Sequence, residues 1–382
     1  MKALKAAEIF TMAGKVFEDG IILIDNGKII DLGINIEIPK EAEIIDFSDK
    51  IIFPGMIDAH THLGIDEAGV GWEGKDYNEM SDPLTPHLRA LDAVNPREEG
   101  IKSARENGIT SVMTSPGSAN VLGGQALVIK TSGIIVDDMV VKNPVGLKAA
   151  FGENPKRVYS ERKESPQTRM AVAAMLRESL MQAEDYRAEK EKKIEAGEAF
   201  KRDIKNESLL MLLNKEVPLK AHAHRADDII TALRIAEEFE LDLTLEHCTE
   251  GHVVADKIAE AGVPAAVGPS LTGKVKVELK ELDFKTAAVL AEAGVKIALI
   301  SDHPVTPVKN LPLYAALAVK AGLPRNAALK AVTINAAELL GIDDRVGSLE
   351  KGKNADLVIF DGDPLDLRSS IEKVMISGSF ID

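Results

Sequence analysis

The middle of the chain repeats one pattern of hydrophobic and polar residues. In "PREEGIKSARENGITSVMTSPG", "ADDIITALRIAEEFELDLTLEH", "GHVVADKIAEAGVPAAVG" and "FKTAAVLAEAGVKIALISD", an amphipathic stretch with helical spacing precedes a short apolar run. In three of the four segments a glycine, Gly108, Gly262 or Gly294, stands between the two, as is usual just past a helix C-terminus. Nearly continuous runs of Val, Ile, Leu and Ala are typical of parallel strands buried on both faces. The pattern therefore predicts helices that alternate with the strands of a parallel sheet.

The length of this repeating region favours a closed sheet. Residues 51–344 suit a (β/α)8 TIM-like barrel, which takes about 250 residues plus insertions. A doubly wound open sheet is the alternative, but no Gly-x-Gly-x-x-Gly fingerprint follows a strand. Residues 165–216 interrupt the alternation of helices and strands with a highly charged, helix-forming sequence. We interpret them as a helical insertion on one barrel connection, and a solvated hairpin is favoured over a substrate lid.

Both ends of the chain have a different pattern of apolar and polar residues. "GIILIDNGKIIDLG" contains two apolar runs joined by Asn26-Gly27, which is a strong hairpin signal. "GKNADLVIFDGDP" and "IEKVMISGSFID" again alternate apolar residues with Gly and Asp turns. We therefore expect residues 1–50 and 345–382 to form one small β-sandwich domain together.

Composition narrows the class of protein. The 382 residues include 45% hydrophobic and 28% charged residues, so a large packed core is expected. The net charge of −15 argues against a nucleic-acid surface, and no apolar run is long enough to cross a membrane. With a single cysteine, Cys248, and no signal-peptide pattern, we expect a cytoplasmic enzyme with a small-molecule substrate, and a homo-oligomer is possible.

Histidines gather where the predicted strands end. "IIFPGMIDAHTH" ends in His60 and His62, and residues two apart on a strand face the same side. "VPLKAHAH", "LDLTLEHC" and "VKIALISDH" end in a second set: His222, His224, His247, Asp302 and His303. One histidine at a strand end is commonly structural, but six of the eight histidines lie at four strand ends. Imidazole and carboxylate side chains suit zinc and related divalent ions, so the pattern predicts a metal site.

The ordered motifs carry a family resemblance. "PGMIDAHTH", "AHAH", "LEHCTEG", "SDHP" and "NAAELLG…GSLEKGKNADLVIFD" resemble the amidohydrolase superfamily and, within it, the imidazolonepropionase-related branch. The similarity spans nearly the whole chain, and it implies a (β/α)8 barrel flanked by a β-sandwich from both chain ends. Carried over by position, it implies His60 and His62 as first-strand ligands, His222 and His247 as fifth- and sixth-strand ligands, and Asp302 as the eighth-strand carboxylate. His224 competes with His222 for its place and otherwise contacts substrate.

The resemblance leaves the number of metal ions open. Many binuclear members of the superfamily use a carboxylated lysine whose carbamate bridges two ions. Lys148 in "NPVGLKAAFGENP" is the first candidate and Lys130 in "ALVIKTSG" the second, with an ordinary surface lysine as the alternative reading. We therefore expect one or two divalent ions per chain, zinc above all.

These residues predict a metal-dependent amidohydrolase that hydrolyses an amide or cyclic amide bond of a small or dipeptide-like molecule. Asp302 is expected to accept the proton of the attacking water and return it to the leaving nitrogen. Arg157 and Tyr159, on a charged loop after Lys148, are candidate substrate contacts, whereas Glu246 is expected to point away from the site. The alternatives are an aminohydrolase (deaminase), an imidazolonepropionase and a catalytically silent barrel used as a binding module.

Overall fold

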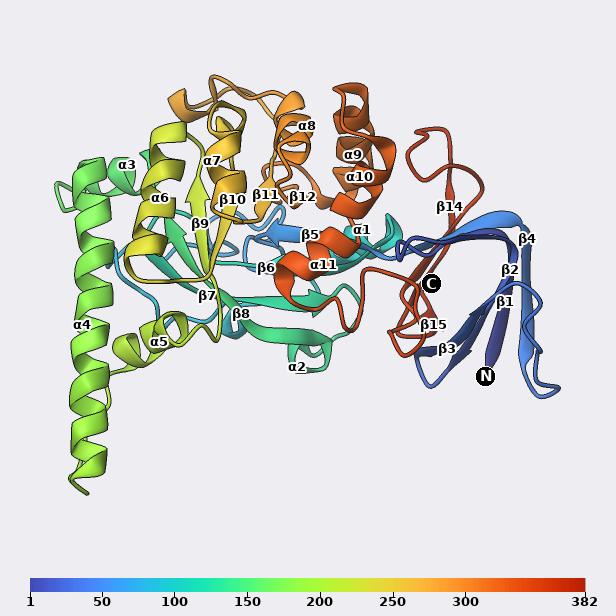
Figure 1. The fold of residues 1–382 in the computed structure, drawn as a ribbon, viewed down its shortest axis with the longest axis horizontal. Coiled ribbons are helices and arrows are strands. Elements are labelled where there is room, and N and C mark those ends of the chain that lie inside the picture. The colour runs from blue at the N-terminus through green and yellow to red at the C-terminus, as the bar shows by residue number, and fades with distance from the viewer. Residues whose placement is uncertain (382) are drawn as a thin grey trace.

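An eight-stranded barrel sheet forms the centre of the molecule (Figure 1). The computed structural model describes residues 1–381. The strands follow one another around the barrel in chain order: β5(Met56–Thr61), β6(Ile109–Thr114), β7(Leu122–Lys130), β8(Val140–Ala150), β9(Leu219–Ala223), β10(Leu243–His247), β11(Ala265–Val267) and β12(Ile297–Leu299). Backbone bonds from His62 N to His303 O (2.8 Å) and from Asp302 N to His60 O (3.1 Å) join the end of β5 to the segment after β12. The predicted barrel is confirmed.

One barrel strand runs against the others. β7 pairs antiparallel with both β6 and β8, whereas every other pair in the sheet is parallel. The expected alternation of helix and strand fails here because residues 115–121 return the chain directly into the sheet, without a covering helix. As a result Leu122 lies near the C-terminal end of the neighbouring strand β8, paired with Ala149, and Lys130 lies at the opposite end. Lys130, the second candidate for carboxylation, is thereby removed from the site.

Amphipathic helices pack around the sheet. In α6(Ala226–Glu238), for example, Ile229, Ala232 and Ile235 are fully buried. The other helices that accompany the barrel are α1(Glu99–Glu106), α2(Val136–Met139), α3(Glu153–Glu161), α7(Ala255–Glu260), α8(Lys285–Glu292), α9(Leu311–Lys320), α10(Arg325–Ala331) and α11(Ile334–Leu340). None of the helices within residues 1–381 is both long enough and apolar enough to span a bilayer.

The segment in which we expect a helical insertion contains two helices, α4(Arg169–Glu195) and α5(Ile204–Leu213). The side chain of Thr168 caps α4 by accepting a hydrogen bond from Ala171 N. The N-terminal half of α4 buries Leu176 and Leu180, whereas its charged C-terminal half extends past the barrel (Figure 1).

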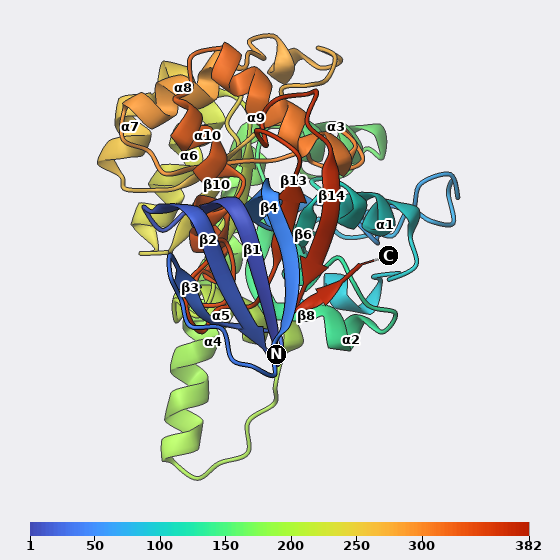
Figure 2. The same ribbon diagram turned by 90° about the vertical axis from the view of Figure 1, so that its right-hand side faces the viewer.

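Both chain ends contribute to one seven-stranded sheet (Figure 2). Its order is β15(Ser379–Phe380), β14(Ile371–Ile376), β13(Leu357–Phe360), β4(Glu43–Pro54), β1(Lys2–Phe10), β2(Val16–Asp25) and β3(Lys28–Gly33). β2 and β3 form the expected hairpin, in which Asn26 and Gly27 have φ values of 47° and 77°. Ile29 N and Gly27 O bond to the backbone of residues 353 and 355, so the β3 edge closes onto the segment before β13. The shared core includes Leu4, Ile22 and Leu357.

Gly55 is the crossing point from this sheet into the barrel. β4 still pairs with β13 at Pro54, and β5 begins at Met56, so the predicted boundary at residue 50 lies within β4. A Cβ atom on residue 55 would lie 2.1 Å from Thr110 Oγ1, which leaves room only for glycine.

A buried ion pair fastens the terminal sheet to the barrel. The ammonium of Lys130, at the end of β7, pairs with the carboxylate of Asp356, just before β13. Asp356 also accepts a hydrogen bond from Ser377 N at 2.8 Å, and both charged side chains are buried.

We expect Lys130→Met to lower the free energy of unfolding by about 3–5 kcal/mol, because the Asp356 carboxylate then remains buried without its cation. The double variant Lys130→Met/Asp356→Asn should recover part of this loss. Urea unfolding followed by circular dichroism measures both. A loss below about 1 kcal/mol in the single variant would show that the pair does not fasten the two sheets.

Candidate metal centre

The first cluster joins the two ends of the barrel sheet. Residues 58 and 60 face one side of β5 because strand side chains alternate, and His62 follows directly after the strand. His60 Nε2 and His62 Nε2 each lie 3.3 Å from Asp302 Oδ1. The Ser115 carbonyl, 2.7 Å from His62 Nδ1, can only accept, so Nδ1 donates this hydrogen bond and Nε2 is the ring nitrogen that faces Asp302. These side chains are the expected first- and eighth-strand residues.

The second cluster contains three imidazoles, those of His222, His224 and His247. Their ring centroids lie 4.3–4.7 Å apart, and each of the three residues is buried. His247 Nδ1 donates to Gly268 O at 2.9 Å, and its Nε2 has no hydrogen-bond partner. The His60 and His247 rings are 4.9 Å apart, so the two clusters adjoin. His222 and His224 are the two candidates for the fifth-strand ligand. Both of them therefore belong to this cluster.

Three buried charged side chains, those of Lys148, Glu246 and Lys220, lie beneath the imidazoles and are called the floor of the site. Lys148 on β8 is fully buried, not a surface lysine, and its Nζ donates to Glu246 Oε2 at 2.7 Å and lies 3.4 Å from His60 Nε2. Glu246 Oε2 also lies 2.8 Å from His60 Nδ1. Lys220 on β9 is the third charged group of this floor and is likewise buried.

The expectation that Glu246 points away from the site is wrong. His247 has a φ of 76°, outside the range of extended strand, so the side chains of residues 246 and 247 do not simply alternate. The sequence carries a signal for both missed residues. Glu246 in "LDLTLEH" and Lys220 in "VPLKAHAH" are charged residues inside otherwise apolar strands, where an ionised side chain needs a partner.

Burial sets the charge state of the second cluster, and neighbouring charges set those of the carboxylates. It holds the pKa values of His222 and His247 well below their ordinary range and lowers that of His224 to about 4, so these rings are neutral near pH 7. Burial alone would raise the pKa of Asp302, but the surrounding imidazoles hold it well below its ordinary value. Burial likewise opposes ionisation of Glu246, whose pKa His60 and Lys148 nevertheless hold well below its ordinary value. The three rings of the second cluster are thus neutral nitrogen donors beside ionised carboxylates. In the first cluster, burial opposes the charged form of His60, but the neighbouring Glu246 and Asp302 carboxylates raise its pKa above the ordinary value.

A cavity of about 440 Å³ opens above the clusters. Its wall includes Arg157 from α3, together with Lys276 and Asn154, whose side chains are hydrogen-bonded at 2.8 Å. Apolar side chains of Met80, Val275 and Val305 also line it. The cavity therefore combines a cationic side with an apolar side above the imidazoles.

Tyr159 does not line this cavity. Its side chain is fully buried, and its hydroxyl donates to Asn120 Oδ1 at 2.7 Å. The residue lies on α3 close to Arg157 in sequence, but it faces the core. The helical turn thus separates two residues that the sequence places on one loop.

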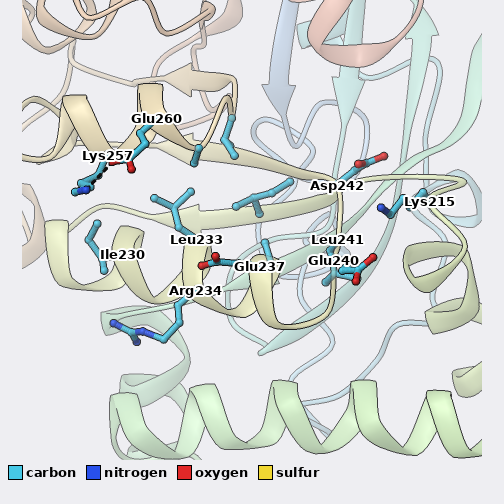
Figure 3. Close-up of a pocket in the computed structure, with 14 residues that line it drawn as sticks. Lys215, Ile230, Leu233, Arg234, Glu237, Glu240, Leu241, Asp242, Lys257 and Glu260 are labelled. Carbon is cyan, nitrogen blue, oxygen red and sulfur yellow. Dashed lines mark hydrogen bonds and ion pairs between the residues drawn. The ribbon is translucent and has the colours of Figure 1, made fainter.

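A second hollow of about 710 Å³ lies elsewhere on the barrel (Figure 3). Residues of α6 and α7 and the start of β10 line it, among them Leu233, Glu237 and Lys257. It contains none of the clustered histidines or carboxylates, so the chemistry belongs to the smaller cavity.

The donor atoms fit a divalent cation. His247 Nε2 and His222 Nδ1 are buried without a hydrogen-bond partner, which is costly unless another group binds them. In each cluster the donor atoms lie within 4.8 Å of one another. Neutral imidazole with carboxylate is a donor set that zinc and related ions accept.

The barrel and the donor groups at its strand ends together define an α/β-barrel enzyme with candidate metal ligands. Residues 51–381 match the Amidohydrolase family, and the chain belongs to this family. It is thus a hydrolase that acts on carbon–nitrogen bonds.

Relatives extend over the whole chain. The crystal structure of an amidohydrolase from Thermotoga maritima MSB8 matches with a TM-score of 0.97 and 47% identity, covering 100% of both chains. Amidohydrolase tasK of Hapsidospora irregularis is 29% identical over 94% of this chain, which spans 39% of that protein's length. Imidazolonepropionase of Fusobacterium nucleatum subsp. nucleatum is 26% identical, covering 90% of this chain and 85% of its own. The predicted relation to the imidazolonepropionase branch is confirmed.

The position of Tyr159 leads to a test. We expect Tyr159→Phe to lower the free energy of unfolding by about 1–3 kcal/mol, because Asn120 Oδ1 loses a buried donor. The KM for any substrate of this enzyme should stay unchanged, in contrast to Arg157→Met. Thermal unfolding and steady-state kinetics of the two variants measure this, and a raised KM in Tyr159→Phe would restore Tyr159 as a substrate contact.

Proposed function

We propose that the protein is a metal-dependent amidohydrolase that hydrolyses an amide or cyclic amide bond of a small or dipeptide-like substrate. The observation that carries the proposal is the pair of adjoining clusters, with neutral buried imidazoles whose nitrogens lack partners, beside the ionised Asp302. A purely structural cluster would leave those nitrogens unsatisfied at a free-energy cost.

The residues divide into two ligand groups. His60, His62 and Asp302 would hold one ion, and His222 and His247 a second, with zinc as the expected metal. Lys148, carboxylated to a carbamate, would be a ligand of both ions. In its formation the neutral amine adds to carbon dioxide, a nitrogen–carbon bond forms, and the displaced proton leaves to solvent. When bound, such a cation lowers the pKa of a coordinated water from about 15.7 to near 7 and polarises a carbonyl oxygen.

The side chains around the ligands complete the chemistry. Asp302, ionised at neutral pH, would accept the proton of the attacking water and return it to the leaving nitrogen. His224, whose Nδ1 lies 2.8 Å from Thr249 Oγ1, would contact the substrate. Arg157 on the cavity wall would bind a substrate carboxylate, because a guanidinium matches its two oxygens.

A one-ion aminohydrolase is the second candidate. The observation in its favour is the 2.7 Å hydrogen bond from Lys148 Nζ to Glu246, which stabilises the lysine as an ammonium and opposes its carboxylation. An imidazolonepropionase activity is a related possibility, since relatives of that name align over 90% of the chain.

The metal requirement is tested on the purified protein. We expect hydrolysis of at least one member of a panel of N-acyl amino acids, dipeptides, hydantoins and imidazolones, loss of activity with a chelator, and its return with Zn²⁺. His62→Ala should lower the metal content by at least one ion per chain, because Asp302 loses its partner ligand. His87→Ala, a histidine outside both clusters, is the matched control. Full metal content in His62→Ala would refute the ligand assignment, and ammonia release from an amidine would favour deamination.

The state of Lys148 is tested with ¹³C-bicarbonate. We expect a carbamate carbon signal in the nuclear magnetic resonance spectrum of the wild type, together with two ions per chain. Lys148→Met should lose that signal and one ion. A wild-type protein with one ion and no carbamate signal would favour the second candidate.

A further inference from the structure

Lys220 is a buried lysine beside the site. The proposed chemistry gives this lysine no role. It lies two residues before His222 on β9, and alternation along the strand puts both side chains on the inner face. Its side chain is fully buried, and its Nζ has no hydrogen-bond partner. A buried ammonium without a counter-charge is strongly unfavourable, so the position calls for a compensating group.

Glu246 is that group. Its Oε1, which also lacks a hydrogen-bond partner, lies 3.9 Å from Lys220 Nζ. Its Oε2 is already engaged by Lys148 Nζ at 2.7 Å and by His60 Nδ1 at 2.8 Å. Lys148 and Lys220 are cross-strand partners on β8 and β9, so two lysines share one carboxylate.

The opposing strand leaves space for the Lys220 side chain. A Cβ atom on Gly146 of β8 would lie 2.8–2.9 Å from Cγ, Cδ and Cε of Lys220. Any residue larger than glycine at position 146 would force the side chain of Lys220 to shift. The barrel wall is therefore shaped around this lysine.

We propose that Lys220 is a positioning residue for the metal site, which holds Glu246 by Oε1 so that Oε2 stays against His60. This inference rests on the proposed function. Glu246 in turn orients the His60 ring through the 2.8 Å ion-pair contact between its Oε2 and His60 Nδ1, and the ring's Nε2 lies toward Asp302. Carboxylates that orient ligating histidines in this way typically contribute 10–100-fold to metal affinity.

The role becomes greater if Lys148 is carboxylated. Its amine then bears a negative carbamate, and Glu246 loses the ammonium that now lies 2.7 Å away. Lys220 remains as the one lysine ammonium facing Glu246. The second lysine thus keeps Glu246 in place whichever form Lys148 adopts.

A double-mutant cycle tests this proposal. The variants are Lys220→Met, Glu246→Gln and their combination, each measured for Zn²⁺ affinity by chelator competition and for the visible spectrum of the Co²⁺-loaded protein. We expect each single variant to weaken cation binding about 10–100-fold and to shift the Co²⁺ spectrum. The double variant should bind no more weakly than the worse single one, because both changes act through the same contact.

Lys130→Met is the matched control, since it removes a buried barrel lysine at the opposite end and should leave affinity and spectrum unchanged. Thermal unfolding identifies variants that do not fold, and Lys220→Gln replaces Lys220→Met in that event. Wild-type affinity and spectrum in a folded Lys220 variant, or additive losses in the cycle, would overturn the proposal. A wild type that binds no divalent cation would instead overturn the proposed function itself, and this inference with it.

Discussion

Two backbone hydrogen bonds between the ends of the barrel sheet determine where the site can form. His62 N bonds to His303 O, and Asp302 N bonds to His60 O. They hold together residues about 240 positions apart in the sequence and put the Asp302 carboxylate 3.3 Å from both first-strand imidazoles. The positions of the candidate ligands on β9 and β10 then follow from barrel closure, because parallel strands end at one face.

Period-two alternation explains why so much of the site could be predicted. His60 and His62, or His222 and His224, need only a strand to share a face, and the order of the motifs then assigned each strand its place in the barrel. Lys148 became a candidate through the family resemblance, as a lysine at the end of a short apolar segment. The direction of β7 was not predictable, because its apolar run reads the same in a parallel or an antiparallel strand. That ambiguity left Lys130 as a candidate, although the reversal of β7 puts it at the other end of the barrel.

The residues that sequence reasoning misplaced depend on backbone detail and on helix rotation. Glu246 reaches His60 because the backbone departs from extended geometry at His247. The type of residue at this position does not predict such a departure. Tyr159 and Arg157 are two positions apart on one helix, yet one faces the core and the other the cavity. Asp302 also has a positive φ, of 53°, and such strained backbone is usual where side-chain placement has precedence over stability.

The pairing of β4 with β13 has a consequence for how the chain folds during synthesis. β4 ends at Pro54, and its partner begins at Leu357. At about 5–20 residues per second, roughly 15–60 s pass between the emergence of the two strands from the ribosome. During that interval the edge of β4 presents unpaired amide and carbonyl groups, which are a template for aggregation. The sheet that β1 to β4 form with β13 to β15 can therefore be completed only after β13 has been synthesised.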